Sequence, residues 1–110
     1  MRALTFVEAG QVAWREAPDP EPADVRGAVV RPLAVARCDL DQVSCGGCRE
    51  CRDGRFAACS TYRARAGAAF GFGEAGGGHG GAVADLLAVP HADHLLVPAP
   101  EAIPATTLCT

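Results

Sequence analysis

The sequence predicts a small, mainly β domain that carries a metal-binding lobe, and three observations predict it. Short apolar runs of strand length are separated by turns and loops rich in proline and glycine. Four of the six cysteines lie within residues 44–60, at a spacing typical of metal ligands. The 110 residues have room for one domain, residues 1–110, whose small core makes a bound metal useful for stability.

The N-terminal part is expected to form a hairpin followed by a loop. Residues 3–7 and 12–15 have the composition of two short strands, and Gly10 lies in the turn between them. Prolines at every second position make residues 18–24 a surface loop, because this composition does not support regular structure.

The rest of the chain predicts short elements as well. Residues 28–36 read as a largely buried strand, and residues 82–90 and 94–98 predict two more strands. Pro104 suits the first turn of a helix over residues 103–108.

The lobe at residues 44–60 has the pattern C-x2-C-x2-C-x7-C, formed by Cys45, Cys48, Cys51 and Cys59. A structural zinc ion takes four soft donors in a tetrahedron, with each sulfur at about 2.3 Å. The glycines at positions 46, 47 and 54 tolerate the positive φ that a tight loop requires. Arginines at positions 49, 52 and 55 help to offset the charge of four thiolates. The pattern therefore favours a structural zinc site.

Three other interpretations of the cysteines remain open on the residues alone. A disulfide framework needs an oxidising compartment, and no feature of the chain indicates export. An iron–sulfur cluster prefers C-x2-C-x2-C-x3-C-P, whereas here the last gap is longer and no proline follows Cys59. A thioredoxin-like C-x-x-C pair opens a helix after a strand, and this segment has too many glycines for that.

The stretch from Ser44 to Cys59 resembles the structural-zinc lobe of the zinc-containing alcohol dehydrogenases, in the medium-chain dehydrogenase/reductase family. Their pattern is close to C-G-x-C-x-x-C-x-x-G-x-x-x-x-C. The opening Met-Arg-Ala-Leu, the Pro-Asp-Pro-Glu-Pro loop and the Gly-Gly-Ala-Val-Ala-Asp stretch at residues 80–85 are also similar, so the resemblance covers almost the whole chain. It implies a partial GroES-like β-barrel with a structural-zinc lobe, a fragment of the family's N-terminal catalytic domain. In those relatives a Rossmann domain follows.

The resemblance also assigns a role to Cys38 and Asp41. In the family this position reads C-x-[ST]-D, which implies that Cys38 is a catalytic-zinc ligand and that Asp41 supports a metal-bound histidine. Leu40 replaces the hydroxyl residue and cannot relay a proton. On the residues alone, Cys38 is simply a small buried side chain at a strand end.

A family segment with a Gly-His-Glu motif is absent, because only three residues separate Asp41 from Cys45. Catalytic zinc generally needs three protein donors and an open position. We therefore expect the catalytic site as usually built to be missing and this chain alone to be inactive.

The sequence gives less support to the other candidate metal ligands. The pair His91 and His94 are two residues apart and suit a second metal site, but we interpret these and His79 as packing or solvated side chains. Cys109 lies near the family's third catalytic ligand. Residues 71–76 match G-x-G-x-x-G, yet more glycines and no helix follow them, so we interpret them as a flexible loop.

The function implied by the resemblance is oxidation of a small alcohol to an aldehyde or ketone, with NAD(P) as hydride acceptor in full-length relatives. Two alternatives belong to other classes. The chain can be a non-catalytic structural or interaction domain stapled by zinc, or the product of a truncated gene. A small redox carrier with bound iron is a third, weaker hypothesis. Substrate identity, the choice between NAD and NADP, and oligomeric state stay open.

Composition excludes several classes of protein. The net charge of −3 provides no basic footprint for nucleic acid, and the chain has no lysine for Schiff-base chemistry. No apolar run is long enough to span a membrane, and an acidic residue at position 8 interrupts any signal peptide. We expect a cytoplasmic location, where thiolates stay reduced and available to metal.

Overall fold

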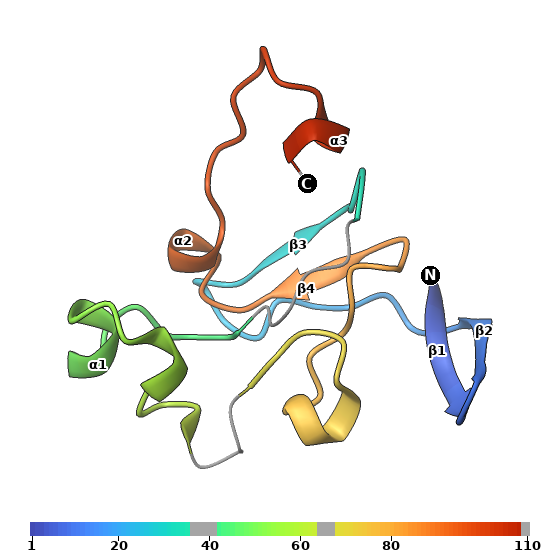
Figure 1. The fold of residues 1–110 in the computed structure, drawn as a ribbon, viewed down its shortest axis with the longest axis horizontal. Helices are drawn as coiled ribbons and strands as arrows, with labels where there is room; N and C mark the ends of the chain where they lie inside the picture. Colours follow the sequence, from blue (N-terminus) through green and yellow to red (C-terminus); the bar gives the residue numbers. More distant parts are fainter. Residues whose placement is uncertain (36–41, 64–67, 109–110) are drawn as a thin grey trace.

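The computed structural model describes residues 1–35, 42–63 and 68–108 (Figure 1). Strands β1 (Arg2–Glu8) and β2 (Gln11–Glu16) form the predicted antiparallel hairpin, in which Leu4 faces Trp14 and Phe6 faces Val12. Gly10 has a φ of +80° in the turn, a backbone conformation that glycine adopts without a steric cost. The predicted hairpin is confirmed.

A second antiparallel pair forms the middle of the molecule. Strand β3 (Ala28–Val30) pairs with β4 (Leu87–Val89), so that Val29 faces Ala88. Both strands are shorter than the predicted 28–36 and 82–90. Pro32 lacks the N–H that a ladder requires, which agrees with the early end of β3.

Single bridges connect the hairpin and the lobe to the rest of the chain. Ala3 bridges to Ala84, and the amide of Leu4 donates to the carbonyl of Val83 at 2.9 Å. Gln42 bridges to Ala69 at the entrance of the lobe. In the part of the chain that the structure describes, these contacts and the two sheets do not close into a barrel, so a partial GroES-like barrel stays a prediction.

The lobe and the loop around residues 71–76 contain short helices. Helix α1 (Arg49–Arg52) and the 3₁₀ turn η1 (Phe56–Ala58) surround the cysteines, and η3 (Gly73–Gly76) occupies the region of the G-x-G-x-x-G match. The amide of Gly77 donates to the carbonyl of Glu74 at 3.0 Å at the end of η3, and the amide of Ala69 donates to the carbonyl of Gly76 at 3.0 Å, so backbone hydrogen bonds hold this loop.

The prediction of a strand over residues 94–98 is wrong. Helix α2 (Ala92–Leu95) includes only the first two of these residues, residues 96–98 lie in no strand, and His91 before the helix has a φ of +48°. That left-handed residue leads the chain into the short helix, and residues 96–98 after it have no strand partner in the described sheets. Helix α3 (Ala105–Leu108) lies within the predicted helix and follows Pro104, as expected.

The most buried residues gather around the cysteine lobe instead of a sheet. Val43, Ser44 and Cys59 are each only 2% exposed, and Ala68 and Ala69 pack at the same place. Several large apolar residues elsewhere stay exposed. The lobe is therefore the best-packed part of the described chain. No helix in the described ranges is both long and apolar enough to cross a membrane.

Candidate metal centre

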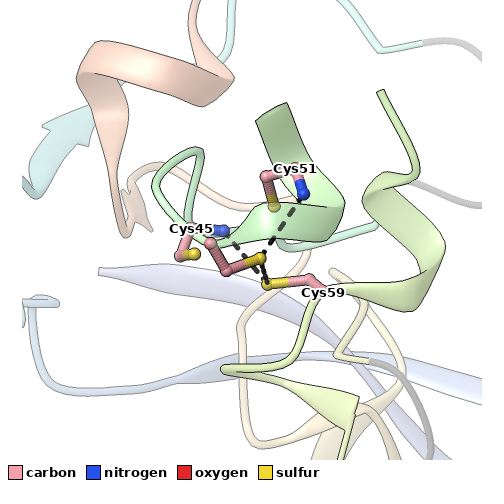
Figure 2. Close-up of side chains that lie close together, drawn as sticks. Cys45, Cys51 and Cys59 are labelled. Carbon is pink, nitrogen blue, oxygen red and sulfur yellow. Dashed lines mark hydrogen bonds between the residues drawn. The ribbon is translucent and has the colours of Figure 1, made fainter. Parts of the chain in front are cut away.

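Four cysteine side chains meet inside the lobe. Their sulfur atoms all lie within 4.8 Å of one another, and the Cys48 and Cys59 sulfurs are 3.9 Å apart (Figure 2). Cys45, Cys51 and Cys59 are buried and Cys48 is half-buried, and all four are free thiols. The set predicted from spacing is thus brought together, and these cysteines do not form the alternative disulfide framework.

The geometry of this cluster suits a tetrahedral metal ion. With sulfur at about 2.3 Å from zinc, the edge of a regular tetrahedron is about 3.8 Å. The separation between the Cys48 and Cys59 sulfurs is close to that edge. Four thiolate donors are typical of structural zinc, whose site leaves no position open for a substrate.

Local structure explains how the short segment converges. Cys48 caps α1, and its sulfur accepts a hydrogen bond from the amide of Cys51 at 3.4 Å. The amide of Cys45 donates to the Cys59 sulfur at 3.4 Å. Gly46 and Gly54 have φ values of +71° and +76°, as expected for these two, whereas Gly47 is not left-handed. The amides of Cys45 and Cys51 therefore donate to cysteine sulfurs within the lobe.

The thiols differ in acidity for physical reasons. Burial raises the pKa of Cys45, but hydrogen bonds from Thr61 and backbone amides outweigh it and lower the pKa to about 5. The amide of Cys51 lowers the pKa of Cys48. Burial raises the pKa of Cys51 to about 12. A metal that binds all four sulfurs must therefore displace a proton from Cys51.

Arg26, far away in sequence, braces the lobe. Its guanidinium donates to the backbone carbonyl of Cys45 at 3.1 Å and to both carboxylate oxygens of Asp93 at 3.1 Å. This hydrogen bond lowers the pKa of Asp93. The lobe is thereby tied to the start of α2. Sequence reasoning missed this contact, because no local pattern links these three positions.

The two histidines of the H-x-x-H pair also hold the lobe. The ring of His94 lies 2.9 Å from the hydroxyl oxygen of Ser44 and packs against Phe56, and the ring of His91 lies 2.9 Å from the hydroxyl oxygen of Tyr62. Their interpretation as packing side chains is confirmed. The second metal site weighed for this pair gains no support from these contacts.

The three arginines of the lobe are engaged locally. Arg52 donates to the carbonyl of Gly47 at 2.8 Å, and Arg55 lies 3.1 Å from Asp53, which Arg49 also approaches. These side chains stabilise the loop around the cysteines. Cys38, Asp41 and Cys109 lie outside the described residues, so their predicted roles stay predictions.

Arg26→Ala is expected to weaken zinc binding by roughly 10-fold, because groups that orient metal ligands typically contribute at least that much affinity. Arg26→Lys should behave similarly, since one ammonium cannot span a carboxylate and a carbonyl as the planar guanidinium does. Competition titration with a chromophoric chelator measures the affinity. Arg15→Ala on strand β2 removes the same charge far from the lobe and should change nothing; equal loss in both alanine variants would contradict the bracing role.

One of three comparisons with known proteins found a similar fold. A scan against protein-family models and a search of curated protein sequences returned no match. Among solved structures, the chain is similar to alcohol dehydrogenase TADH from Thermus sp. ATN1. The TM-score is 0.66 at 21% identity, over 84% of this chain and 38% of that one.

This likeness establishes an alcohol dehydrogenase-like fold for the chain. The match spans 38% of the length of its structural neighbour, so it corresponds to only part of such an enzyme. Together with four cysteines placed to hold a metal ion, it defines a domain with a candidate zinc site.

Proposed function

We propose that this chain is the zinc-binding domain of an alcohol dehydrogenase-like oxidoreductase, and that Cys45, Cys48, Cys51 and Cys59 hold one structural zinc ion. The observation that carries the proposal is the convergence of four free thiols within 4.8 Å. The fold likeness to an alcohol dehydrogenase supports the enzyme class.

Bound zinc would supply crosslinking and folding free energy to this lobe. The chain's own residues hold the sulfur ligands in place and shield them from water. The amides of Cys45 and Cys51 donate to sulfur, and burial excludes water from three of the four thiols. Because the four donors fill a tetrahedron, the site binds no substrate. Its role in our proposal is structural.

For the longer protein of this type we propose oxidation of a small alcohol with NAD(P) as hydride acceptor. Cys38 and Asp41 are the residues that the sequence resemblance offers for a catalytic metal. A non-catalytic domain stapled by zinc is the second candidate. For this chain by itself the four-cysteine set favours the non-catalytic candidate, because four thiolates leave no coordination position open for a substrate.

Native mass spectrometry of the purified chain is expected to find one zinc per chain. Cys38→Ser should keep that zinc, because the four-cysteine lobe does not include this residue. Two zinc ions in the parent and one in Cys38→Ser would instead indicate a second site at Cys38. A metal-free chain would refute the proposed structural site.

An activity assay separates the two candidate functions. Reduction of NAD or NADP is followed with a panel of small alcohols, for the chain and for Cys38→Ser. We expect no turnover by the chain alone. Turnover that Cys38→Ser abolishes would exclude the non-catalytic candidate.

A further inference from the structure

The four clustered cysteines differ in their access to solvent. Cys48 is half-buried, whereas the other three are buried, with at most 7% of each residue exposed. Gly47, which precedes Cys48, is exposed as well, so this corner of the cluster faces water. A small solute therefore reaches Cys48 before it reaches the other three ligands.

The sulfur of Cys48 has a close sulfur neighbour. It lies 3.9 Å from the sulfur of Cys59, which is 2% exposed. Cys51 meets the Cys48 sulfur through its backbone amide, at 3.4 Å, and both contacts are drawn as dashed lines in Figure 2. A disulfide joins two sulfurs at about 2.05 Å, so Cys48 and Cys59 must approach by about 2 Å, a displacement that a change of side-chain rotamer can supply.

A two-electron oxidation can join this pair. A cysteine that binds zinc is a thiolate, and hydrogen peroxide oxidises accessible thiolates. The Cys48 thiolate attacks one peroxide oxygen, the O–O bond breaks, hydroxide leaves and Cys48 becomes a sulfenic acid. The Cys59 thiolate then attacks the Cys48 sulfur, so that the S–S bond forms and the S–O bond breaks with loss of a second hydroxide. Two protons from solvent convert both hydroxides to water, and the two thiolates have supplied both electrons that reduce the peroxide.

We propose that the four-cysteine lobe is a peroxide-sensitive zinc switch, in which Cys48 is oxidised first and then forms a disulfide with Cys59. This inference rests on the structural zinc proposed above. The disulfide removes two thiolates, so only Cys45 and Cys51 remain as ligands, whereas structural zinc takes four. Zinc then leaves, and the lobe loses the folding free energy that the metal supplies. Reduction by a dithiol returns two electrons and restores all four thiolates.

Treatment of the purified, zinc-loaded chain with hydrogen peroxide tests this switch. Native mass spectrometry measures zinc before and after treatment, and peptide mapping without reductant identifies the disulfide. We expect the loss of one zinc and two thiols per chain, a disulfide between Cys48 and Cys59, and recovery of zinc binding after treatment with dithiothreitol.

The possible outcomes separate this inference from the proposed function. A chain that binds no zinc before peroxide is added would refute the structural site, and the inference with it. A chain that binds one zinc and keeps it in peroxide would overturn the inference alone. A first disulfide between Cys48 and Cys51, or between any other two cysteines, would also overturn it.

Cys48→His tests whether oxidation enters through this residue. Histidine nitrogen is a common zinc ligand, so the variant keeps four donors but lacks the half-buried sulfur. The rate constant of zinc release in peroxide, followed with a chromophoric chelator, should fall to a small fraction of the parent value. Cys38→Ser and Cys109→Ser are the controls and should release zinc as fast as the parent. Release from Cys48→His at the parent rate would overturn the proposal, and if this variant binds no zinc, the disulfide mapped in the parent decides the same point.

Discussion

Cys51→Ala is expected to strip the metal from the lobe and unfold residues 44–60. Cys51 is 5% exposed at the centre of the cluster, and its replacement leaves three thiols around an open position. Structural zinc in small domains contributes on the order of 10 kcal/mol at neutral pH. The described chain is most tightly packed around this cluster, so the domain has little other core to compensate.

Zinc content and thermal unfolding measure this effect. We expect zinc to fall to a small fraction of one per chain and the cooperative thermal transition to disappear or move far down in temperature. Cys38→Ser is the control, since it removes a cysteine that the cluster does not include. Unchanged zinc content and an unchanged transition in Cys51→Ala would refute the four-cysteine assignment.

Gly46→Ala is expected to destabilise the domain by roughly 2–6 kcal/mol. Gly46 has a φ of +71°, and a left-handed residue with a side chain costs about 1–3 kcal/mol. An added Cβ would also lie 2.6 Å from Cγ of His94, so the ring must move. Overpacking of this kind typically costs a further 1–3 kcal/mol or so. The displaced ring would also lose its contact with Ser44.

Two other glycines of the lobe separate the backbone cost from the steric cost. The free energy of unfolding is measured by chemical denaturation of each zinc-loaded variant. Gly54→Ala meets a φ of +76° but no atom within 4 Å, so it should lose only the backbone part. Gly47→Ala meets no atom within 4 Å and has no positive φ, so its free energy of unfolding should change little. If Gly46→Ala lost no more than Gly54→Ala, the close packing of His94 on the lobe would be contradicted.

The local elements of the fold could be predicted from sequence alone. The hairpin is confirmed because its alternating residues and its glycine turn all lie within one short segment. The cysteine cluster was predictable for the same reason, since its four ligands span few residues and the C-x2-C turn restricts where thiols point. The fold likeness to an alcohol dehydrogenase agrees with the resemblance noted in the motifs.

Contacts between distant segments could not be predicted. The strand expected over residues 94–98 did not form, because residues 94 and 95 belong to α2 and residues 96–98 have no strand partner in the described sheets. Arg26 precedes β3 and Asp93 follows β4, so the pairing of these strands brings the two together, and the lobe places the Cys45 carbonyl within reach of the same guanidinium. Proximity of this kind depends on strand pairing, not on a repeat in the sequence.

The sequence by itself determined which residues can bind metal, because cysteine spacing acts over a few residues of backbone. It also determined that the hairpin has one face with large apolar residues, since alternation sets that face. Only the tertiary structure decided that this face points to solvent and that arginine and histidine side chains brace the lobe. Those outcomes depend on which segments pack together, and packing is decided by the free energy of the whole chain.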